Sequence, residues 1–235
     1  MTQERQPFHE LVESAVALIK DGDVVGLGSG RAATAFIHGL GDRVRAGLNI
    51  RGIPTSEATA ALARQLGIPL TSMDDTANID VDVDGADEVD PKLNLIKGYG
   101  AALVREKIVA AASRRFVVLI GPEKLVDTLG SRGRLPVEVI PFSVGPCRRR
   151  LAELGYPPTL RSDSGKPVIT DNGNYILDCR VTAIPDPAEL DATLRGIPGV
   201  VGTGLFVDMA HMVLIQRDAT VEIRRRSGAT RASRQ

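Results

Sequence analysis

The sequence has few aromatic residues, no excess of either charge and no long apolar run, and the last two absences exclude whole classes of protein. Aromatic residues make up only 3% of the 235 residues. The 29 basic and 29 acidic side chains cancel, so no whole-chain field would recruit nucleic acid or an anionic membrane. No segment approaches the ~20 apolar residues of a membrane span, and Glu13 and Lys20 interrupt the N-terminal stretch that a signal peptide would need. We expect a cytoplasmic protein with small-molecule partners, and neither nucleic acid nor membrane.

Cysteine is also scarce. The two cysteines, Cys147 and Cys179, have no CxxC spacing and no nearby histidine pattern, which argues against a metal site or a redox motif. Buried free thiols are the better interpretation, and they fit a reducing cytoplasm.

Helix and strand patterns alternate over the first ~130 residues, as they do in α/β domains. Helical periodicity covers residues 10–20, 32–40, 57–66 and 101–112. Strand patterns cover residues 24–27, 50–53, 67–71, 79–84 and 115–120. Together they predict an α/β fold, a three-layer Rossmann-like domain with a mostly parallel sheet. Its ligand should lie beyond the carboxyl ends of the strands.

The composition changes after Gly130, because nine of the 14 prolines lie between Pro136 and Pro198. The pattern there is a strand, a helix, a hairpin and a helix, at residues 136–141, 146–154, 167–178 and 187–195. Asn172-Gly173 predicts a type I′ turn for the hairpin. We expect a smaller inserted α+β (ferredoxin-like) domain. The predicted division is a catalytic domain of residues 1–130 and 205–224, the insertion at 131–204, and a disordered basic tail at 225–235.

One stretch, residues 79–112, gathers charged groups in a segment that otherwise has a buried pattern. Its charged residues include the carboxylates Asp84, Asp87 and Glu106 and the lysine Lys97. Lys97 lies in a loop before a helix N-terminus, a place that favours anions. Glu106 has apolar neighbours three and four residues away, which should raise its pKa toward the range of a general base. The same spacing gives Arg105 and Lys107 apolar neighbours, so periodicity does not choose among the three.

Two further segments could hold an anion. Gly28-Ser29-Gly30 lies between a strand and a helix, which in α/β folds brings backbone amides onto a phosphate, although a tight turn without a ligand has the same pattern. It is neither a P-loop nor a full dinucleotide fingerprint. Thr55 or Ser56 precedes the next helix, where a hydroxyl caps the helix or holds a phosphate.

The acidic run also raises the possibility of a calcium loop. Asp80, Asp82, Asp84 and Gly85 match its first six positions, but the twelfth, which should be glutamate, is Pro91. We therefore expect no metal, and we assign Asp80 and Asp82 to the solvent face of a strand.

DGADE at residues 84–88, followed by KGYGAALVREK at residues 97–107, resembles the paired signature of the ribose-5-phosphate isomerase A family. Five other blocks of the chain also match the family and occur in its order, two before this signature and three after it. They lie at residues 26–30, 54–56, 135–142, 170–178 and 197–206. The resemblance implies an aldose–ketose isomerase that interconverts ribose 5-phosphate and ribulose 5-phosphate in the non-oxidative pentose phosphate pathway. It implies no cofactor and a homodimer or homotetramer. It also implies that residues 201–207 and 211–217 are strands returning to the first domain.

The same resemblance implies roles for individual residues. Glu106 would carry the proton between C2 and C1, and Asp84 and Asp87 would open the sugar ring and shuttle the hydroxyl proton. The chemistry of the reaction itself needs a fixed positive group or donors at the developing negative charge, and Lys97 and the amides of Gly98 to Gly100 are suited to that. The expected substrate-binding residues are Gly28, Ser29, Gly30, Arg31, Ala32, Thr55, Ser56, Gly85, Ala86, Gly98, Tyr99, Gly100 and Lys124.

The chain departs from the family pattern at two places. The phosphate loop GTGST of the family is GSGRA here, with Arg31 and Ala32 in place of two hydroxyl residues, and Tyr99 replaces the middle glycine of KGGG. Three other functions use the same or a related fold. A sugar-phosphate sensor would need no Glu106 and would normally carry a DNA-binding segment, but the sequence has no helix-turn-helix pattern. The blocks do not follow the order of the other two, an amino-sugar phosphate deaminase and a coenzyme A transferase.

Overall fold

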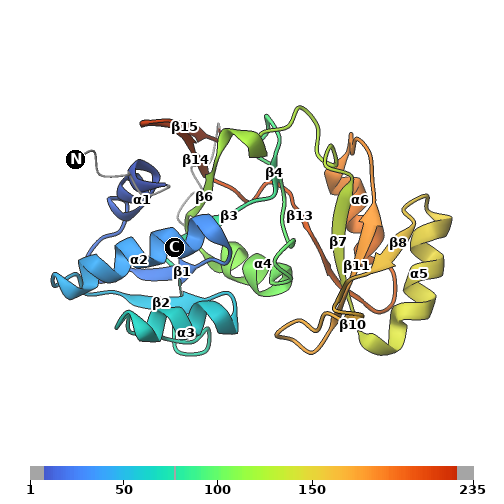
Figure 1. Ribbon diagram of the computed structural model, residues 1–235, viewed down its shortest axis with the longest axis horizontal. Helices are drawn as coiled ribbons and strands as arrows, with labels where there is room; N and C mark the ends of the chain where they lie inside the picture. Colours follow the sequence, from blue (N-terminus) through green and yellow to red (C-terminus); the bar gives the residue numbers. More distant parts are fainter. Residues whose placement is uncertain (1–7, 77, 227–235) are drawn as a thin grey trace, which may run out of the picture.

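The large sheet of the molecule has six strands, and all but one run parallel. The computed structural model describes residues 8–76 and 78–226. Figure 1 shows the sheet beside a smaller one, with the chain passing between them. The strand order is β15(Thr220–Arg225), β14(Met212–Arg217), β6(Phe116–Ile120), β3(Val81–Gly85), β1(Val24–Leu27) and β2(Arg51–Pro54). Only β15 is antiparallel to its neighbour.

Both faces of this sheet are covered, as parallel sheets require. Val117 and Leu119 point to a core shared with α1(His9–Val16), α2(Arg31–Arg45) and α3(Glu57–Gln65). Val118 and Ile120 point the other way, to a core with α4(Leu103–Ala112) and short strands. The predicted three-layer, mostly parallel α/β architecture is thus confirmed.

The smaller sheet is antiparallel, with the order β12(Val200–Thr203), β7(Arg134–Val139), β11(Tyr175–Arg180) and β8(Pro158–Leu160). Helix α5(Val144–Glu153) follows β7, and α6(Pro187–Arg195) precedes β12. This βαββαβ order is that of a ferredoxin-like unit, and it has its own apolar core. The predicted division of the chain at residues 130 and 204 stays a prediction.

A three-stranded sheet lies between the two units. It contains β13(Leu205–Phe206), β5(Leu95–Ile96) and β4(Glu88–Val89). The predicted strand at 201–207 is therefore wrong in part, because β12 joins the small sheet and β13 pairs with β5. Only the following strand, β14, returns to the large sheet.

Several predicted elements have different bounds. The first helix ends at Val16, and the second continues to Arg45. The second was predicted too short because Gly39 and Gly41 suggest an end. Helix packing explains the glycine at position 39 instead, since a Cβ on Gly39 would lie 2.4 Å from the Val12 side chain. The strand predicted at 67–71 is also wrong, since only Leu70 forms an isolated bridge, to Gly52.

The hairpin at residues 167–178 differs from the prediction. Gly173 has φ 77° but Asn172 does not have a positive φ, so the turn is not type I′. Gly173 N–H donates to Thr170 O at 2.8 Å, which centres the turn one residue earlier. Buried Glu138 fixes this shape, because its Oε1 accepts bonds from Thr170 Oγ1 and from the side-chain Nδ2 groups of Asn172 and Asn174. Residues 166–167 (β10) pair with 162–163 (β9) instead, and Ile169 alone bridges to Tyr175.

The predicted start of the disordered basic tail, residue 225, is too early in the chain. Arg225 lies in β15, and Arg226 binds Leu93 O at 3.0 Å and Asp208 at 2.6 Å. These two arginines are ordered because each finds a backbone or carboxylate partner. The rest of the tail lies outside the described residues. No helix in the described ranges combines the length and apolarity that a membrane crossing needs.

Candidate functional site

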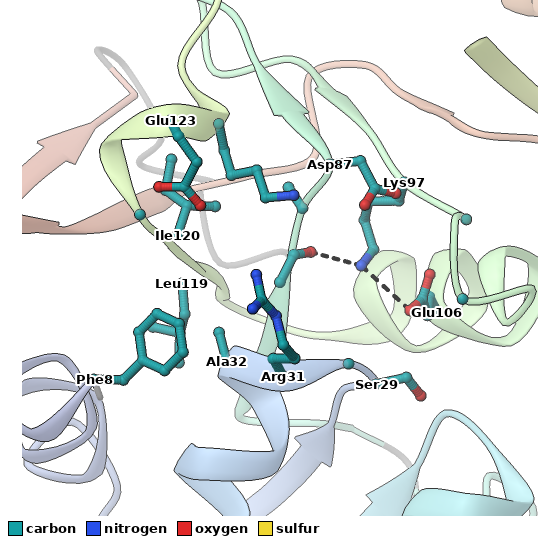
Figure 2. Close-up of a pocket in the computed structure, with 17 residues that line it drawn as sticks. Phe8, Ser29, Arg31, Ala32, Asp87, Lys97, Glu106, Leu119, Ile120 and Glu123 are labelled. Atoms are coloured by element: carbon teal, nitrogen blue, oxygen red, sulfur yellow. Dashed lines mark hydrogen bonds and ion pairs between the residues drawn. The ribbon is translucent and has the colours of Figure 1, made fainter. Parts of the chain in front are cut away.

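A cavity lies beyond the carboxyl ends of β1, β3 and β6, where the sequence predicts the ligand (Figure 2). Its lining combines the loop after β1, the turn after β3, the loop after β5 and the end of β6. The lining residues are Phe8, Ser29, Gly30, Arg31, Ala32, Gly85, Ala86, Asp87, Lys97, Gly98, Gly100, Glu106, Leu119, Ile120, Gly121, Glu123 and Lys124. Five expected site residues are not among the lining residues: Gly28, Thr55, Ser56, Asp84 and Tyr99.

Lys97 lies at the centre of the charged groups and is only 3% exposed. Its Nζ is 3.0 Å from Asp84 Oδ2 and 3.4 Å from Glu106 Oε1, and it donates to Gly85 O at 2.6 Å. Burial alone would lower the pKa of Lys97, but the two carboxylates outweigh it and raise the pKa above its ordinary value. The lysine is therefore a permanent positive charge in the wall of the cavity.

Asp84 is fully buried beneath the loop after β1. Its Oδ1 accepts bonds from Ser29 N at 3.0 Å and Gly85 N at 2.7 Å, while Oδ2 faces Lys97. Burial raises the pKa of Asp84, and Lys97 and the two amides oppose the rise. A Cβ on Gly28 would lie 2.3 Å from the Asp84 carboxyl carbon. Glycine at this position thus lets the loop close over the aspartate.

Glu106 is the residue of the Arg105–Lys107 triplet that reaches the cavity. One carboxyl oxygen faces Lys97 and the other, Oε2, has no hydrogen-bond partner among the described residues. Burial raises the pKa of Glu106 to about 8, with Lys97 opposing and Asp84 adding to the rise. A carboxyl with such a pKa can accept and return a proton near neutral pH.

The neighbours of Glu106 have structural partners instead. Arg105 bonds Glu57 Oε1 at 2.8 Å and Asn172 Oδ1 at 3.0 Å. Lys107 is 3.5 Å from Asp191. The choice that periodicity left open is decided by what packs against each face of α4.

Asp87 and the loop after Lys97 form one edge of the cavity. Asp87 is half-buried, and its Oδ2 accepts a bond from Tyr99 N at 3.0 Å. The ring of Tyr99 turns away and stacks on Arg134, with the guanidinium carbon 3.8 Å from the ring centre. The bulky residue at this family glycine therefore leaves the cavity open.

The opposite edge is suited to an anion. Gly30 and Arg31 line the cavity at the N-terminus of α2, where unpaired amides and the helix dipole favour negative charge. Figure 2 shows the Arg31 side chain reaching into the same space as Lys97. Lys124, half-buried after β6, lines this space too.

The hydroxyl groups expected at this edge hold one another. Ser29 Oγ is 2.9 Å from both Thr55 Oγ1 and Ser56 Oγ. Ser56 Oγ also accepts a bond from Thr59 N at 3.1 Å, which confirms that Ser56 caps α3. Thr55 donates to Leu27 O. These contacts fix the loop after β1 against the start of α3.

Five lining residues were not predicted: Phe8, Leu119, Ile120, Gly121 and Glu123. The last four lie at or after the end of β6, where the rule on carboxyl ends of parallel strands could have found them. Phe8 precedes α1 and reaches the cavity only through tertiary packing. Among the described residues, no group of three or more His, Cys, Asp or Glu side chains could hold a metal ion.

The prediction that Asp82 faces solvent is wrong. Asp82 is fully buried, neither carboxyl oxygen has a hydrogen-bond partner among the described residues, and a Cβ on Gly26 would lie 2.5 Å from Oδ1. Alternation along β3 does not mark a solvent face because α4 covers that side of the sheet. Asp80, by contrast, is partly exposed, accepts a bond from Val24 N and pairs with Arg114.

Replacing Asp82 with valine should stabilise the fold, and increasingly so as pH rises. Burial, and then the neighbouring Asp84, raise the pKa of Asp82 well above its ordinary 3.8. Above pH 3.8, Asp82 ionises in the unfolded chain but keeps its proton in the folded protein. Asp82 therefore lowers the free energy of unfolding, and by more at each higher pH until the raised pKa is reached. We expect a gain of ~1–3 kcal/mol at neutral pH, measured by urea unfolding across pH. Asp80→Val should destabilise instead, and a loss of stability in Asp82→Val at every pH would contradict the argument.

Known proteins resemble this chain over most of its length. The family model described as ribose 5-phosphate isomerase A (phosphoriboisomerase A) matches residues 51–220. Ribose-5-phosphate isomerase A of Roseiflexus sp. (strain RS-1) is 50% identical over 215 residues, 90% of this chain and 92% of that protein. The structure of ribose 5-phosphate isomerase A from Methanocaldococcus jannaschii is 42% identical with a TM-score of 0.88, covering 92% of this chain and 96% of that one. A D-ribose-5-phosphate isomerase in complex with phospho-erythronic acid is 41% identical, with the same TM-score and coverage.

Proposed function

The chain belongs to the ribose 5-phosphate isomerase A family, and we propose that it interconverts D-ribose 5-phosphate and D-ribulose 5-phosphate through the Lys97, Asp84 and Glu106 cluster. This is an aldose–ketose isomerisation of the non-oxidative pentose phosphate pathway. The observation that carries the assignment of residues is the buried Lys97 between two carboxylates, with Glu106 open to the cavity.

The reaction moves one proton between carbons and one between oxygens. Glu106 removes the proton from C2 of the open-chain aldose, and the electrons of the C–H bond form the C1–C2 double bond of an enediolate. The same carboxyl then returns the proton to C1, while the O2 proton moves to O1. No electron leaves the substrate, so the step balances without a redox partner.

Lys97 and the amides of the following loop stabilise the enediolate. The negative charge gathers on O1 and O2, and a fixed cation in a buried wall is worth far more there than in water. Lys97 needs no reorganisation to serve, because Asp84 and Gly85 O already hold its Nζ.

The two aspartates of the DGAD motif have different surroundings and so different roles. Both oxygens of Asp84 are occupied, one by two amides and the other by Lys97. We assign Asp84 to orienting Lys97. Asp87 lines the cavity and carries one amide bond, so we assign ring opening and the hydroxyl proton transfer to Asp87.

The phosphate would bind at the N-terminus of α2, between Gly30, Arg31 and Lys124. Replacing Arg31 with alanine should raise KM for ribose 5-phosphate about 10- to 150-fold, the equivalent of ~1.5–3 kcal/mol for a charged hydrogen bond. KM for unphosphorylated ribose should change little. Arg45→Ala, at the exposed far end of the same helix, is the control. An unchanged KM for the phosphorylated sugar in Arg31→Ala would show that the backbone amides and Lys124 bind the phosphate without Arg31.

The direct test of the function is ribulose 5-phosphate formation by the purified protein after metal stripping. We expect turnover that EDTA does not reduce, together with solvent deuterium at the transferred position in part of the product. A protein that binds ribose 5-phosphate without converting it would be a sensor instead. Assembly as a homodimer or homotetramer and location in the cytoplasm are proposals that rest on the family alone.

A further inference from the structure

The loop that carries Lys97 into α4 is held by the small ferredoxin-like unit. Residues 98–102 are irregular between β5 and α4, and Gly98 and Ala101 have positive φ values of 105° and 64°. A loop with such a backbone needs outside contacts to keep one shape. Arg161, between β8 and β9, supplies two of them.

One guanidinium nitrogen of Arg161 binds two consecutive carbonyls of this loop. Nη1 donates to Gly98 O at 2.8 Å and to Tyr99 O at 3.0 Å. The other side of the guanidinium faces Asp178 of β11, with Nε 2.9 Å from Oδ2 and Nη2 2.5 Å from Oδ1. This two-point pairing fixes the plane of the guanidinium, so its remaining donors have a defined direction.

The direction of these carbonyls sets the direction of two amides. In a trans peptide the N–H of the next residue points opposite to the C=O, and the described chain has no cis peptide. With Gly98 O turned to Arg161, Tyr99 N–H points the other way and reaches Asp87 Oδ2 at 3.0 Å. With Tyr99 O turned the same way, the N–H of Gly100, which lines the cavity, also points away from Arg161.

Stability is a weak explanation for this arrangement. The side chains of Arg161 and Asp178 are 11% and 14% exposed, and a mostly buried ion pair commonly contributes no more to stability than apolar residues of the same volume. What the ion pair does is orient groups: Asp178 fixes the plane of the Arg161 guanidinium, and the guanidinium fixes the two peptide groups whose carbonyls it binds. Tyr99 adds to it by stacking on Arg134, whose carbonyl accepts the Tyr99 hydroxyl at 3.3 Å.

We propose that Arg161 and Asp178 are positioning residues of the isomerisation. Through the two carbonyls they hold the Tyr99 amide on Asp87 and aim the Gly100 amide at the cavity side where the enediolate oxygens form. The inference rests on the proposed function. It makes the small unit part of the catalytic apparatus, although neither residue lines the cavity.

Arg161→Met and Asp178→Asn should lower kcat about 10- to 100-fold, less than the 10²–10³ for complete loss of an oxyanion donor, while KM for ribose 5-phosphate changes less than about 3-fold. Phospho-erythronic acid has a carboxylate where the enediolate has its oxygens, so its Kd should rise by about the factor that kcat falls. Guanidinium ion, at concentrations far below those that unfold the protein, should restore part of kcat to Arg161→Ala. Arg180→Met, an exposed arginine at the end of β11, is the matched control.

The outcomes separate this proposal from the proposed function. If the wild type and Arg180→Met isomerise ribose 5-phosphate and the Arg161 variants equal them, the function stands and the positioning role is overturned. The positioning role is also overturned if the loss of kcat is explained by a smaller folded fraction, seen as a lowered Tm, and guanidinium ion restores no kcat to Arg161→Ala. If the wild type itself does not isomerise the sugar, the proposed function fails and the positioning role fails with it.

Discussion

Replacing Glu106 with glutamine is expected to lower kcat for ribose 5-phosphate by ~10²–10⁴-fold, the usual contribution of a positioned proton carrier. KM should change only a few fold, because glutamine keeps the shape and the contact with Lys97 that Oε1 makes at 3.4 Å. Steady-state kinetics with purified enzyme measure both constants. Retention of a tenth of the wild-type kcat would remove Glu106 from this role.

The cavity supplies a matched control for this variant. Glu123 lines the same space but lies after β6, away from Lys97, and is exposed. Glu123→Gln should therefore keep a kcat close to that of the wild type. A large loss in Glu123→Gln would show that the charge of the cavity, rather than one proton carrier, governs the rate.

The pH dependence of the wild type follows from the same residue. The base must be ionised to remove the C2 proton, and burial raises the pKa of Glu106 to about 8. For the aldose direction, kcat/KM should therefore rise with pH and level off above about 8. In Glu106→Gln the residual rate should lose this dependence. A wild-type profile that is flat from pH 6 to 9 would contradict the raised pKa.

The chemistry of the site could be predicted from sequence because its charged residues lie close together in the chain. Lys97, Asp87 and Glu106 come from one stretch of strand, loop and helix, so a short pattern contains them. The fold was predictable for a similar reason, since alternation of helix and strand is a local signal. The structure added the partner of each group, such as Gly85 O for Lys97.

Features that depend on the distant part of the chain could not be predicted. Asp82 has the alternation of an exposed strand, and only the placement of α4 on that face makes it buried. Arg161 is 63 positions from Gly98, the residue whose carbonyl it binds. The hairpin turn at Asn172 is set by Glu138 on another strand. In each case a tertiary contact overrides the local preference.

Removing the charge of Lys97 should have an effect comparable with the loss of Glu106, and it should also move the pH profile. Lys97→Ala should lower kcat by ~10²–10³-fold, the usual loss when one group that stabilises an oxyanion is removed. Lys97→Arg should lower it less, because charge at the enediolate matters most and placement comes next. Lys92→Ala, an exposed lysine on the neighbouring turn, should match the wild type.

The shift in the profile follows from the partners of Lys97. Lys97 lowers the pKa values of both Asp84 and Glu106 against the effect of burial. Without it both pKa values rise, so the residual activity of Lys97→Ala should begin at higher pH than the wild-type activity. Leaving a buried carboxylate unpaired should also cost ~3–5 kcal/mol of folding stability, which urea unfolding measures. Equal damage in Lys97→Ala and Lys97→Arg, with kcat unchanged and only KM raised, would instead make Lys97 a contact of the phosphate.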